Sequence, residues 1–278
     1  MTLTQALRAI QTFGVDRLDA QLLLLHTLGR PTHDRAWLLA HDSDALPDAL
    51  ETTLMALAQR RAAGEPLAYI VGRKEFFGLD LQVDTHTLVP RPDTETLVEW
   101  SLEVIGSTPA NVLDLGTGSG AIALAIRHAA PQTQVTAVDA SAGALAMARA
   151  NAQRLALPIG FHHGSWFAAL PASITSRFDL IVSNPPYIAE HDPHLPALAF
   201  EPRSALTAGV DGLDDIRSIV QQAPQHLQPG GWLLLEHGYD QAPAVCALLA
   251  AAGFNAVQSR QDLGGHARCS GGQFPTAP

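Results

Sequence analysis

The stretch Val112-Leu113-Asp114-Leu115-Gly116-Thr117-Gly118-Ser119-Gly120 decides the fold of this chain. It begins as a mostly apolar strand, continues as a glycine-rich turn and leads into a helical pattern. Glycine lets the backbone adopt positive φ and pass close to a ligand. The N-terminus of the following helix then faces that ligand. The stretch therefore predicts the first βα unit of a nucleotide-binding α/β sheet.

The next strand ends in an acid. Asp139 follows the apolar run Val135–Val138 and lies 23 residues after Gly116. A carboxylate at this point can accept hydrogen bonds from both hydroxyls of a ribose. A dinucleotide fold expects Gly-x-Gly-x-x-Gly, whereas this chain has Gly-x-Gly-x-Gly preceded by Asp114, which would repel a pyrophosphate but can hold an ammonium group. These residues favour S-adenosylmethionine over a nicotinamide dinucleotide, and a purely structural glycine turn is the remaining alternative.

Apolar strands alternate with helical patterns from about residue 93 onward. Such alternation is typical of parallel βαβ units in a doubly wound α/β sheet. The expected strands cover 111–115, 134–138, 178–183 and 232–236, and the expected helices cover 93–105, 119–130, 141–156, 211–227 and 240–252. Segments around 254–261 and 266–274 follow each other without a helix, so we expect a terminal antiparallel hairpin.

The first 75 residues have a different pattern, with apolar residues at helical spacing between capping residues. Asp16 and Thr32 are expected to open helices, and Pro47 lies at a helix start. We therefore expect a small helical bundle over 1–75. A hairpin connector is expected over 76–92, and the catalytic domain over 93–278.

Composition limits the class of partner. The chain has a formal net charge of −10, is 47% apolar and 16% charged, and thus has the composition of a well-buried globular protein. Residues 76–278 hold eighteen acids and nine bases, which makes a poor surface for a phosphate backbone. We therefore expect a protein or small-molecule substrate and no direct binding of nucleic acid.

Targeting and metal-binding signals are weak. The N-terminal residues lack the charged and apolar regions of a signal peptide, and no apolar run approaches the ~20 residues needed to span a bilayer. Two isolated cysteines do not suggest a disulfide framework or a zinc site. Proline interrupts His191-Asp192-Pro193-His194, which we interpret as a polar loop. We expect a cytoplasmic protein that binds no membrane and no metal.

A rigid corner, Asn184-Pro185-Pro186-Tyr187, follows the strand at 178–183. Proline fixes φ and has no N–H, so the corner offers the Asn184 amide oxygen and backbone carbonyls as acceptors. Such acceptors suit a planar NH2 group, which they can hold by both of its N–H bonds. In isolation, a proline-rich turn that closes a strand is the alternative. Trp166, after the third strand, either flanks an adenine ring or packs in the core.

Together these residues resemble the glutamine-N5 methyltransferases that modify peptide-chain release factors, the HemK/PrmC family. The resemblance extends to Tyr69-Ile70-x-Gly72-x-x-Glu75-Phe76-x-Gly78-Leu79, Val89-Pro90-Arg91-Pro92-Asp93-Thr94-Glu95, Glu201-Pro202-x-x-Ala205-Leu206, Asp211-Gly212-Leu213 and Leu235-Glu236-His237-Gly238. In the sister family that acts on a large-subunit ribosomal protein, a different sequence follows the Pro90-Arg91 pair. The segment Pro90–Glu95 therefore favours the release-factor family.

The resemblance implies a class I methyltransferase fold with a seven-stranded, mostly parallel sheet and S-adenosylmethionine as the methyl donor, converted to S-adenosyl-L-homocysteine. It implies that the donor binds to Gly116, Thr117, Gly118, Ser119, Gly120, Asp139, Trp166 and Asn184. The glutamine of the Gly-Gly-Gln motif of a release factor would bind to Asn184, Pro185, Pro186 and Tyr187, with Asn184 and Tyr187 as catalytic residues. The bundle over 1–75 would help to dock the factor.

The chain departs from the family pattern at three places. Ser165 stands where the family has an acid that contacts the adenine amine, and the loop at 194–200 looks short. The last strand contains Gly271-Gly272-Gln273, which is the tripeptide that the family methylates. A chance match is the ordinary interpretation, and self-methylation or self-inhibition through Gln273 is the alternative.

Two rival functions stay open. Enzymes that methylate exocyclic amines of adenine or guanine in nucleic acid use the same kind of corner, although they usually carry a basic surface. A non-enzymatic module that binds a nucleotide and a protein has no reason to keep the corner at 184–187. The acidic balance argues against the first rival, and the corner argues against the second.

Overall fold

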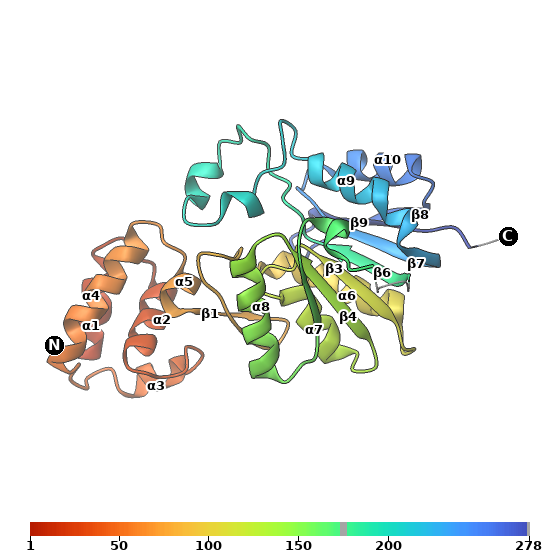
Figure 1. Ribbon diagram of the computed structural model, residues 1–278. Coiled ribbons are helices and arrows are strands. Elements are labelled where there is room, and N and C mark those ends of the chain that lie inside the picture. The colour runs from red at the N-terminus through yellow and green to blue at the C-terminus, as the bar shows by residue number, and fades with distance from the viewer. Residues whose placement is uncertain (173–176, 277–278) are drawn as a thin grey trace. The chain divides into compact units, whose positions relative to one another are not determined.

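The computed structural model describes residues 1–172 and 177–276 (Figure 1). The chain divides into two compact units, Met1–Arg73 and Lys74–Pro278. Within the described residues, the helices are all too short or too polar to cross a membrane.

The first unit is a bundle of short helices, as the sequence predicts. Its helices are α1 (Leu3–Gln11), α2 (Arg17–Thr27), α3 (Arg35–Ala40), α4 (Asp48–Ala62) and α5 (Leu67–Val71). Fully buried leucines, among them Leu23, Leu24 and Leu54, form its core. The Asp16 carboxylate caps α2 by accepting the Asp19 N–H at 3.0 Å.

Two details of the bundle differ from the sequence prediction. The third helix begins at Arg35 and not at Thr32, because residues 31–34 form a turn in which the Asp34 N–H donates to the Pro31 carbonyl at 3.0 Å. Helix α5 was not predicted. It is a five-residue segment that follows Pro66, too short for a helical period to be visible in the sequence.

A two-stranded sheet of β1 (Arg73–Phe76) and β2 (Leu79–Gln82) forms a hairpin, which begins three residues before the connector expected over 76–92 and ends at Gln82. Both turn residues have positive φ, 50° at Phe77 and 76° at Gly78. This backbone matches the twist of paired strands, so the glycine in the sequence pattern lies where the turn requires it.

The second unit is built on a seven-stranded sheet with the order β5-β4-β3-β6-β7-β9-β8. The strands are β3 (Asn111–Leu115), β4 (Gln134–Asp139), β5 (Gly160–His163), β6 (Phe178–Ser183), β7 (Leu227–Glu236), β8 (Asn255–Gln261) and β9 (Ala267–Gln273). The first five are parallel to one another, and β9 is antiparallel to both of its neighbours. This is the doubly wound, mostly parallel sheet that the sequence predicts.

Helices cover both faces of this sheet (Figure 1). They are α6 (Glu95–Ile105), α7 (Ala121–Ala129), α8 (Ala142–Leu155), α9 (Asp214–Gln222) and α10 (Ala242–Ala251). Successive strand residues point to opposite faces: Val112 packs in the same core cluster as residues of α6 and α7, whereas Leu113 packs in the cluster that includes α9 and α10. The glycine loop and the corner at 184–187 therefore leave the sheet from strands that are packed on both sides.

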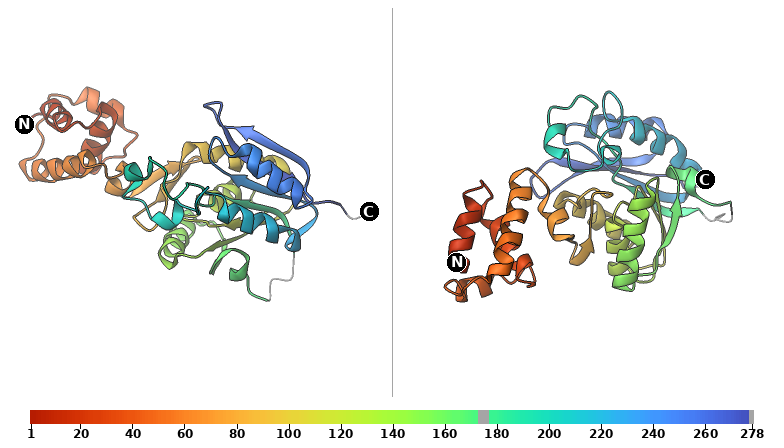
Figure 2. Two further views of the ribbon diagram at one scale, coloured as in Figure 1. Left: turned by 90° about the horizontal axis from the view of Figure 1, so that it is seen from above. Right: turned by 60° about the vertical axis from the view of Figure 1, so that its left-hand side comes forward.

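Strand β9 is inserted between β7 and β8, and these strands lie at one edge of the sheet (Figure 2). Gln273 pairs with Trp232, which in turn pairs with Leu180 near the start of β6. Its side-chain amide donates to the Gly230 carbonyl at 2.9 Å. Gln273 is thus a paired strand residue at the amino ends of the parallel strands, opposite to the edge where the corner lies, and this position speaks against self-methylation.

Candidate functional site

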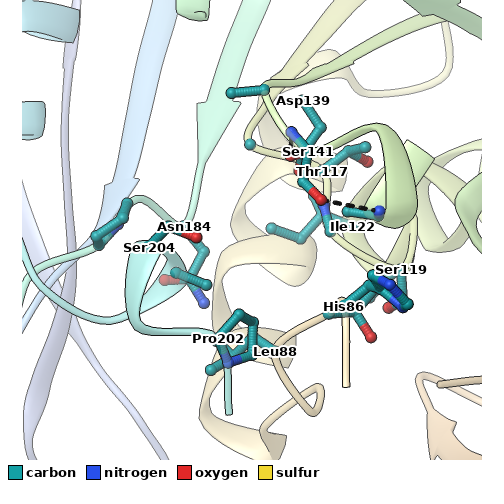
Figure 3. Close-up of a pocket in the computed structure, with 18 of the residues that line it drawn as sticks. His86, Leu88, Thr117, Ser119, Ile122, Asp139, Ser141, Asn184, Pro202 and Ser204 are labelled. Atoms are coloured by element: carbon teal, nitrogen blue, oxygen red, sulfur yellow. Dashed lines mark hydrogen bonds between the residues drawn. The ribbon is translucent and has the colours of Figure 1, made fainter. Parts of the chain in front are cut away.

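A cavity of about 420 Å³ opens at the carboxyl ends of β3, β4 and β6. In Figure 3, Asn184 and Ser204 lie on one side of it, and Thr117, Asp139 and Ser141 lie on the other. The carboxyl edge of a doubly wound sheet, at the point where the strand order reverses, is where such folds bind ligands. Here the reversal falls between the neighbouring strands β3 and β6.

The glycine loop forms one wall of the cavity. Gly116 and Gly118 have φ of 73° and 56°, and the N–H groups of Gly116 and Thr117 both donate to the Val138 carbonyl at 2.9 Å. A Cβ atom built on Gly116 would lie 3.2 Å from the Trp166 ring. The loop needs glycine because of its backbone conformation and because the indole packs directly against it.

Asp139 lies at the end of β4 and lines the same cavity. Its two carboxylate oxygens accept the N–H groups of Gly118 and Ser141, each at 2.8 Å. Burial is the main influence on this carboxyl and raises its pKa above the ordinary value. The hydrogen bond to Gly118 ties β4 to the glycine loop and orients the carboxylate.

Asp114 has a structural position behind the loop. It is fully buried and does not line the cavity, and its Oδ2 atom accepts from the Thr117 hydroxyl at 2.6 Å and from the Ala123 N–H at 3.2 Å. Burial raises its pKa to about 7. The carboxylate therefore braces the loop against α7. Its Oδ1 atom has no partner among the described residues, and the contact of Asp114 with a ligand ammonium stays a prediction.

The corner at 184–187 forms the opposite wall. Asn184 is half-buried and lines the cavity together with Pro186, and its Nδ2 donates to the Thr94 hydroxyl at 3.3 Å. Pro185 is buried behind them. The Tyr187 hydroxyl donates to Glu236 at 3.3 Å, and burial raises the pKa of Tyr187 so that the phenol stays neutral.

Two residues outside the corner hold its backbone in place. The Gln241 side-chain amide donates to the carbonyls of Tyr187 at 3.0 Å and Asp211 at 3.3 Å. A Cβ on Gly212 would lie only 2.2 Å from the Tyr187 carbonyl oxygen. The close approach explains the glycine in Asp211-Gly212-Leu213, a motif whose role the sequence did not reveal.

An ion pair connects the segment that follows the corner to the chain before α6. Arg91, which lines the cavity, donates to Glu201, and the other Glu201 oxygen accepts the Val89 N–H at 3.0 Å. The Glu201 side chain is 3% exposed. The pair therefore fixes two motifs that are 110 residues apart in the sequence.

The structure brings most of the predicted site residues to one cavity. Those that line it are Gly116, Thr117, Gly118, Ser119, Asp139, Trp166, Asn184 and Pro186. Gly120, Pro185 and Tyr187 do not line it. Gly120, with φ of 86°, directly precedes α7 and packs against Leu124 and Ala148. Pro185 is buried, and the hydroxyl of Tyr187 bonds to Glu236.

Sequence reasoning gave no role to several lining residues, which include His86, Thr94, Ser204 and Asp215. Asp215, in α9, accepts a hydrogen bond from the Trp166 side chain, and burial raises its pKa. Ser165 also lines the cavity. Asp215 thus places an acid beside the indole, although position 165 lacks one. Asp215 and Trp166 are far apart in the sequence, so only the structure reveals that they are neighbours.

The loop at 191–194 has the character of a polar turn. The Asp192 carboxylate accepts the His194 N–H at 2.7 Å and lies 2.8 Å from the imidazole Nδ1. Across residues 1–172 and 177–276, no three His, Cys, Asp or Glu side chains gather as a metal ion requires.

Comparison with known proteins defines the class first. Residues 94–199 match the family described as methyltransferase small domain. A methyltransferase from Pyrococcus furiosus shares the fold with a TM-score of 0.56 and 20% identity, over 78% of this chain and 97% of that one. A Thermus thermophilus 16S rRNA methyltransferase solved with AdoMet and guanosine does so with a TM-score of 0.54 and 22% identity, over 73% and 49%. The fold is that of the class I methyltransferases, and residues 94–199 match a methyltransferase domain family.

The particular family follows from closer relatives. Residues 2–72 match the PrmC N-terminal domain. Proteins named release factor glutamine methyltransferase are 51% identical in Bordetella pertussis, over 93% of this chain and 95% of the relative, and 47% identical in Vibrio cholerae, over 99% and 98%. The chain belongs to the release factor glutamine methyltransferase family.

Proposed function

We propose that this protein transfers a methyl group from S-adenosylmethionine to N5 of the glutamine in the Gly-Gly-Gln motif of peptide-chain release factors. One observation carries the proposal: Asn184 and Pro186 of the corner line the same cavity as the glycine loop and Asp139, and Nδ2 of Asn184 is already bonded to Thr94. The names of the relatives support the release factor as substrate. The choice of the Gly-Gly-Gln glutamine follows from the family resemblance.

The cavity residues fit S-adenosylmethionine, which supplies an electrophilic methyl group on a sulfonium. The loop at 116–118 leaves room for a ligand because its glycines carry no side chain. The Trp166 ring, which packs against Gly116, lines the same cavity. Asp139 presents a carboxylate, oriented by two backbone N–H groups, toward the position of a ribose. We assign Gly116 to Gly120, Asp139, Trp166 and Asn184 to the donor site, with Gly120 acting through the start of α7.

Asp215 supplies the acid that position 165 lacks. Its carboxylate accepts from the Trp166 indole and lines the cavity, so it lies beside the ring that we assign to the adenine. A carboxylate oxygen has lone pairs for more than one donor. Asp215 can therefore accept from the adenine amine while it keeps its bond to the indole.

The corner is suited to an amide substrate. The nitrogen lone pair of a carboxamide is delocalised into its carbonyl, and the ~18–20 kcal/mol barrier to peptide rotation indicates the strength of that delocalisation. The Asn184 side-chain oxygen can accept one N–H of the substrate, and we assign the other N–H to the Pro185 carbonyl, although Pro185 is buried and does not line the cavity. These two bonds orient the nitrogen and stabilise positive charge that develops on it. Tyr187, held by Glu236, fixes the angle of the corner.

The N-terminal bundle, Met1–Arg73, is proposed as the part that helps to dock the release factor. The match of residues 2–72 to the PrmC N-terminal domain supports this assignment.

The proposal is tested by incubating the protein with labelled S-adenosylmethionine and one of three acceptors. These are a purified release factor, the same factor with Gln→Ala in its Gly-Gly-Gln motif, and total RNA. We expect label in the intact factor only. Label in RNA would favour methylation of a base amine, and equal labelling of both factors would place the methyl group elsewhere.

A further inference from the structure

A buried carboxylate without an assigned role lies behind the corner. Glu236 ends β7 and is 1% exposed, and burial raises its pKa to about 7. It accepts a hydrogen bond from the Tyr187 hydroxyl at 3.3 Å, and the neighbouring Thr94 hydroxyl lowers its pKa. Among the described residues its Oε2 atom has no partner. Burying an ionised carboxylate costs free energy unless hydrogen bonds or an ion pair compensate for the lost hydration.

Thr94 connects this carboxylate to the cavity. Its hydroxyl carries a single hydrogen, which the neighbouring Glu236 carboxylate attracts. The oxygen of the same hydroxyl is then left as an acceptor, and it accepts from Nδ2 of Asn184 at 3.3 Å. Thr94 is 3% exposed, so water does not compete readily for either bond. Above a pH of about 7, Glu236 is ionised and can only accept, which fixes the direction of the whole chain of bonds.

The direction matters because the two ends of an asparagine amide have nearly the same shape and opposite hydrogen-bonding character. With Nδ2 bonded to Thr94, Oδ1 is the end of Asn184 that is left for a ligand in the cavity. The reversed amide would present an NH2 group to the NH2 group of the substrate. Two donors cannot bond to each other, so the reversed form does not bind the substrate nitrogen in a reactive orientation.

We propose that Glu236 is a positioning residue which, through the Thr94 hydroxyl, fixes the Asn184 amide with its oxygen toward the substrate. This inference rests on the proposed function, because it assumes that the substrate presents an NH2 group to Asn184. Glu236 itself touches neither the substrate nor the donor.

The test uses the full-length protein with a purified release factor and labelled S-adenosylmethionine. Four variants are compared: Thr94→Val, which removes the hydroxyl at nearly constant shape, Thr94→Ser, which keeps it, Glu236→Gln, and the Thr94→Val/Glu236→Gln double variant. Thr133→Val is the matched control, since Thr133 is also a buried threonine but lies before β4, and its hydroxyl has no partner among the described residues. The readouts are kcat, KM for the release factor, Kd for the donor, and the melting temperature.

We expect kcat to fall about 10²-fold in Thr94→Val and about 10-fold in Glu236→Gln, which is the scale seen when one oriented polar contact is lost from an active site. KM and the donor Kd should change little in both variants, and the melting temperature should change little in Thr94→Val. Thr94→Ser and Thr133→Val should keep kcat within about threefold of the wild type. The double variant should be no slower than Thr94→Val, because Glu236 acts only through the hydroxyl.

The inference is overturned if the two losses multiply in the double variant, if Thr94→Ser is as slow as Thr94→Val, or if Glu236→Gln retains the wild-type kcat. Each of these outcomes requires that the wild-type protein methylates the release factor. A wild-type protein that does not methylate it contradicts the proposed function instead.

Discussion

The glycine loop and the proline corner occupy equivalent places in the fold and have opposite chemistry. They follow neighbouring parallel strands in which Leu115 pairs with Ser183, so Gly116 and Asn184 each begin a turn at the same level of the sheet. The glycines of the loop can adopt positive φ, and each of them carries a backbone N–H group. The corner has two residues whose φ is fixed and which have no N–H.

This difference shows how one edge of a sheet can bind two ligands, with the glycine loop suited to one and the corner suited to the other. A wall with close backbone approach and a helix N-terminus suits a large polar ligand with hydroxyl and carboxylate groups. The acceptors of the corner, which are the Asn184 amide oxygen and the proline carbonyls, suit an NH2 group, because its two N–H bonds donate. Variants that damage one wall should therefore leave the binding of the other ligand intact.

The largest effect is expected at the corner. Asn184→Ala removes the side-chain acceptor, and we expect kcat for the release factor to fall about 10²- to 10³-fold, the scale for losing one oriented active-site group. The donor Kd, measured by calorimetry, should rise by less than about fivefold, because the loop and Asp139 stay in place. A variant with near-normal kcat would remove Asn184 from the reaction.

The matching test of the loop wall is Asp139→Ala. Loss of hydrogen bonds to a charged group should raise the donor Kd about 10- to 10²-fold, and saturating donor should restore much of the rate. Asp179→Ala is the control, because Asp179 also accepts a backbone N–H, that of Asn111 at 2.8 Å, but at the amino ends of the strands. Equal donor binding by the two variants would contradict the assignment of the ribose contact.

The rigidity of the corner is tested by Gly212→Ala. The added Cβ would lie 2.2 Å from the Tyr187 carbonyl oxygen and displace the corner, so we expect kcat to fall about 10-fold, since small misplacements of reacting groups are costly. Gly265→Ala has a similar positive φ, but no atom lies within 4 Å of its added Cβ. It therefore controls for backbone strain alone, and a kcat loss of the same size there would show that the clash is irrelevant.

The smallest effect concerns stability. Burial raises the Glu236 pKa from 4.5 to about 7, so between these pH values the folded chain retains a proton that the unfolded chain gives up. The free energy of unfolding therefore falls as the pH rises through this range. Glu236→Gln has no such titration, and its melting temperature relative to the wild type should rise by about 2–5 °C between pH 5 and pH 8. A difference that does not change with pH would contradict the burial of an ionisable group.

The sequence predicts those parts of the fold that depend on local patterns. Alternating apolar segments indicate the sheet, and the glycines at 116–120 locate the loop, because both signals lie within a few residues of one another. The same reasoning places Asp139 and the corner at one edge of the sheet, since the carboxyl ends of parallel strands meet there.

Contacts between distant segments could not be predicted in this way. Thr94 accepts from Asn184 and neighbours Glu236, which lie about 90 and 140 positions away in the sequence, and no periodic pattern of residues indicates such contacts. The bonds of Asp114 to Thr117 and Ala123, which connect it to the loop and to α7, are likewise visible only in the structure. An acid at the end of a buried strand, as at Glu236, is the one signal that could have drawn attention to the network.

The position of β9 has a consequence for synthesis of the protein. Although it follows β8 in the chain, β9 lies between β7 and β8, and it satisfies the backbone of β7 from Trp232 to Glu236. A nascent chain that has not yet delivered residues 267–273 therefore exposes a long apolar strand with an unpaired edge. Such edges associate with other chains, so polypeptides that stop short of Ala267 should aggregate and depend on chaperones, even though every residue that lines the cavity has already been made.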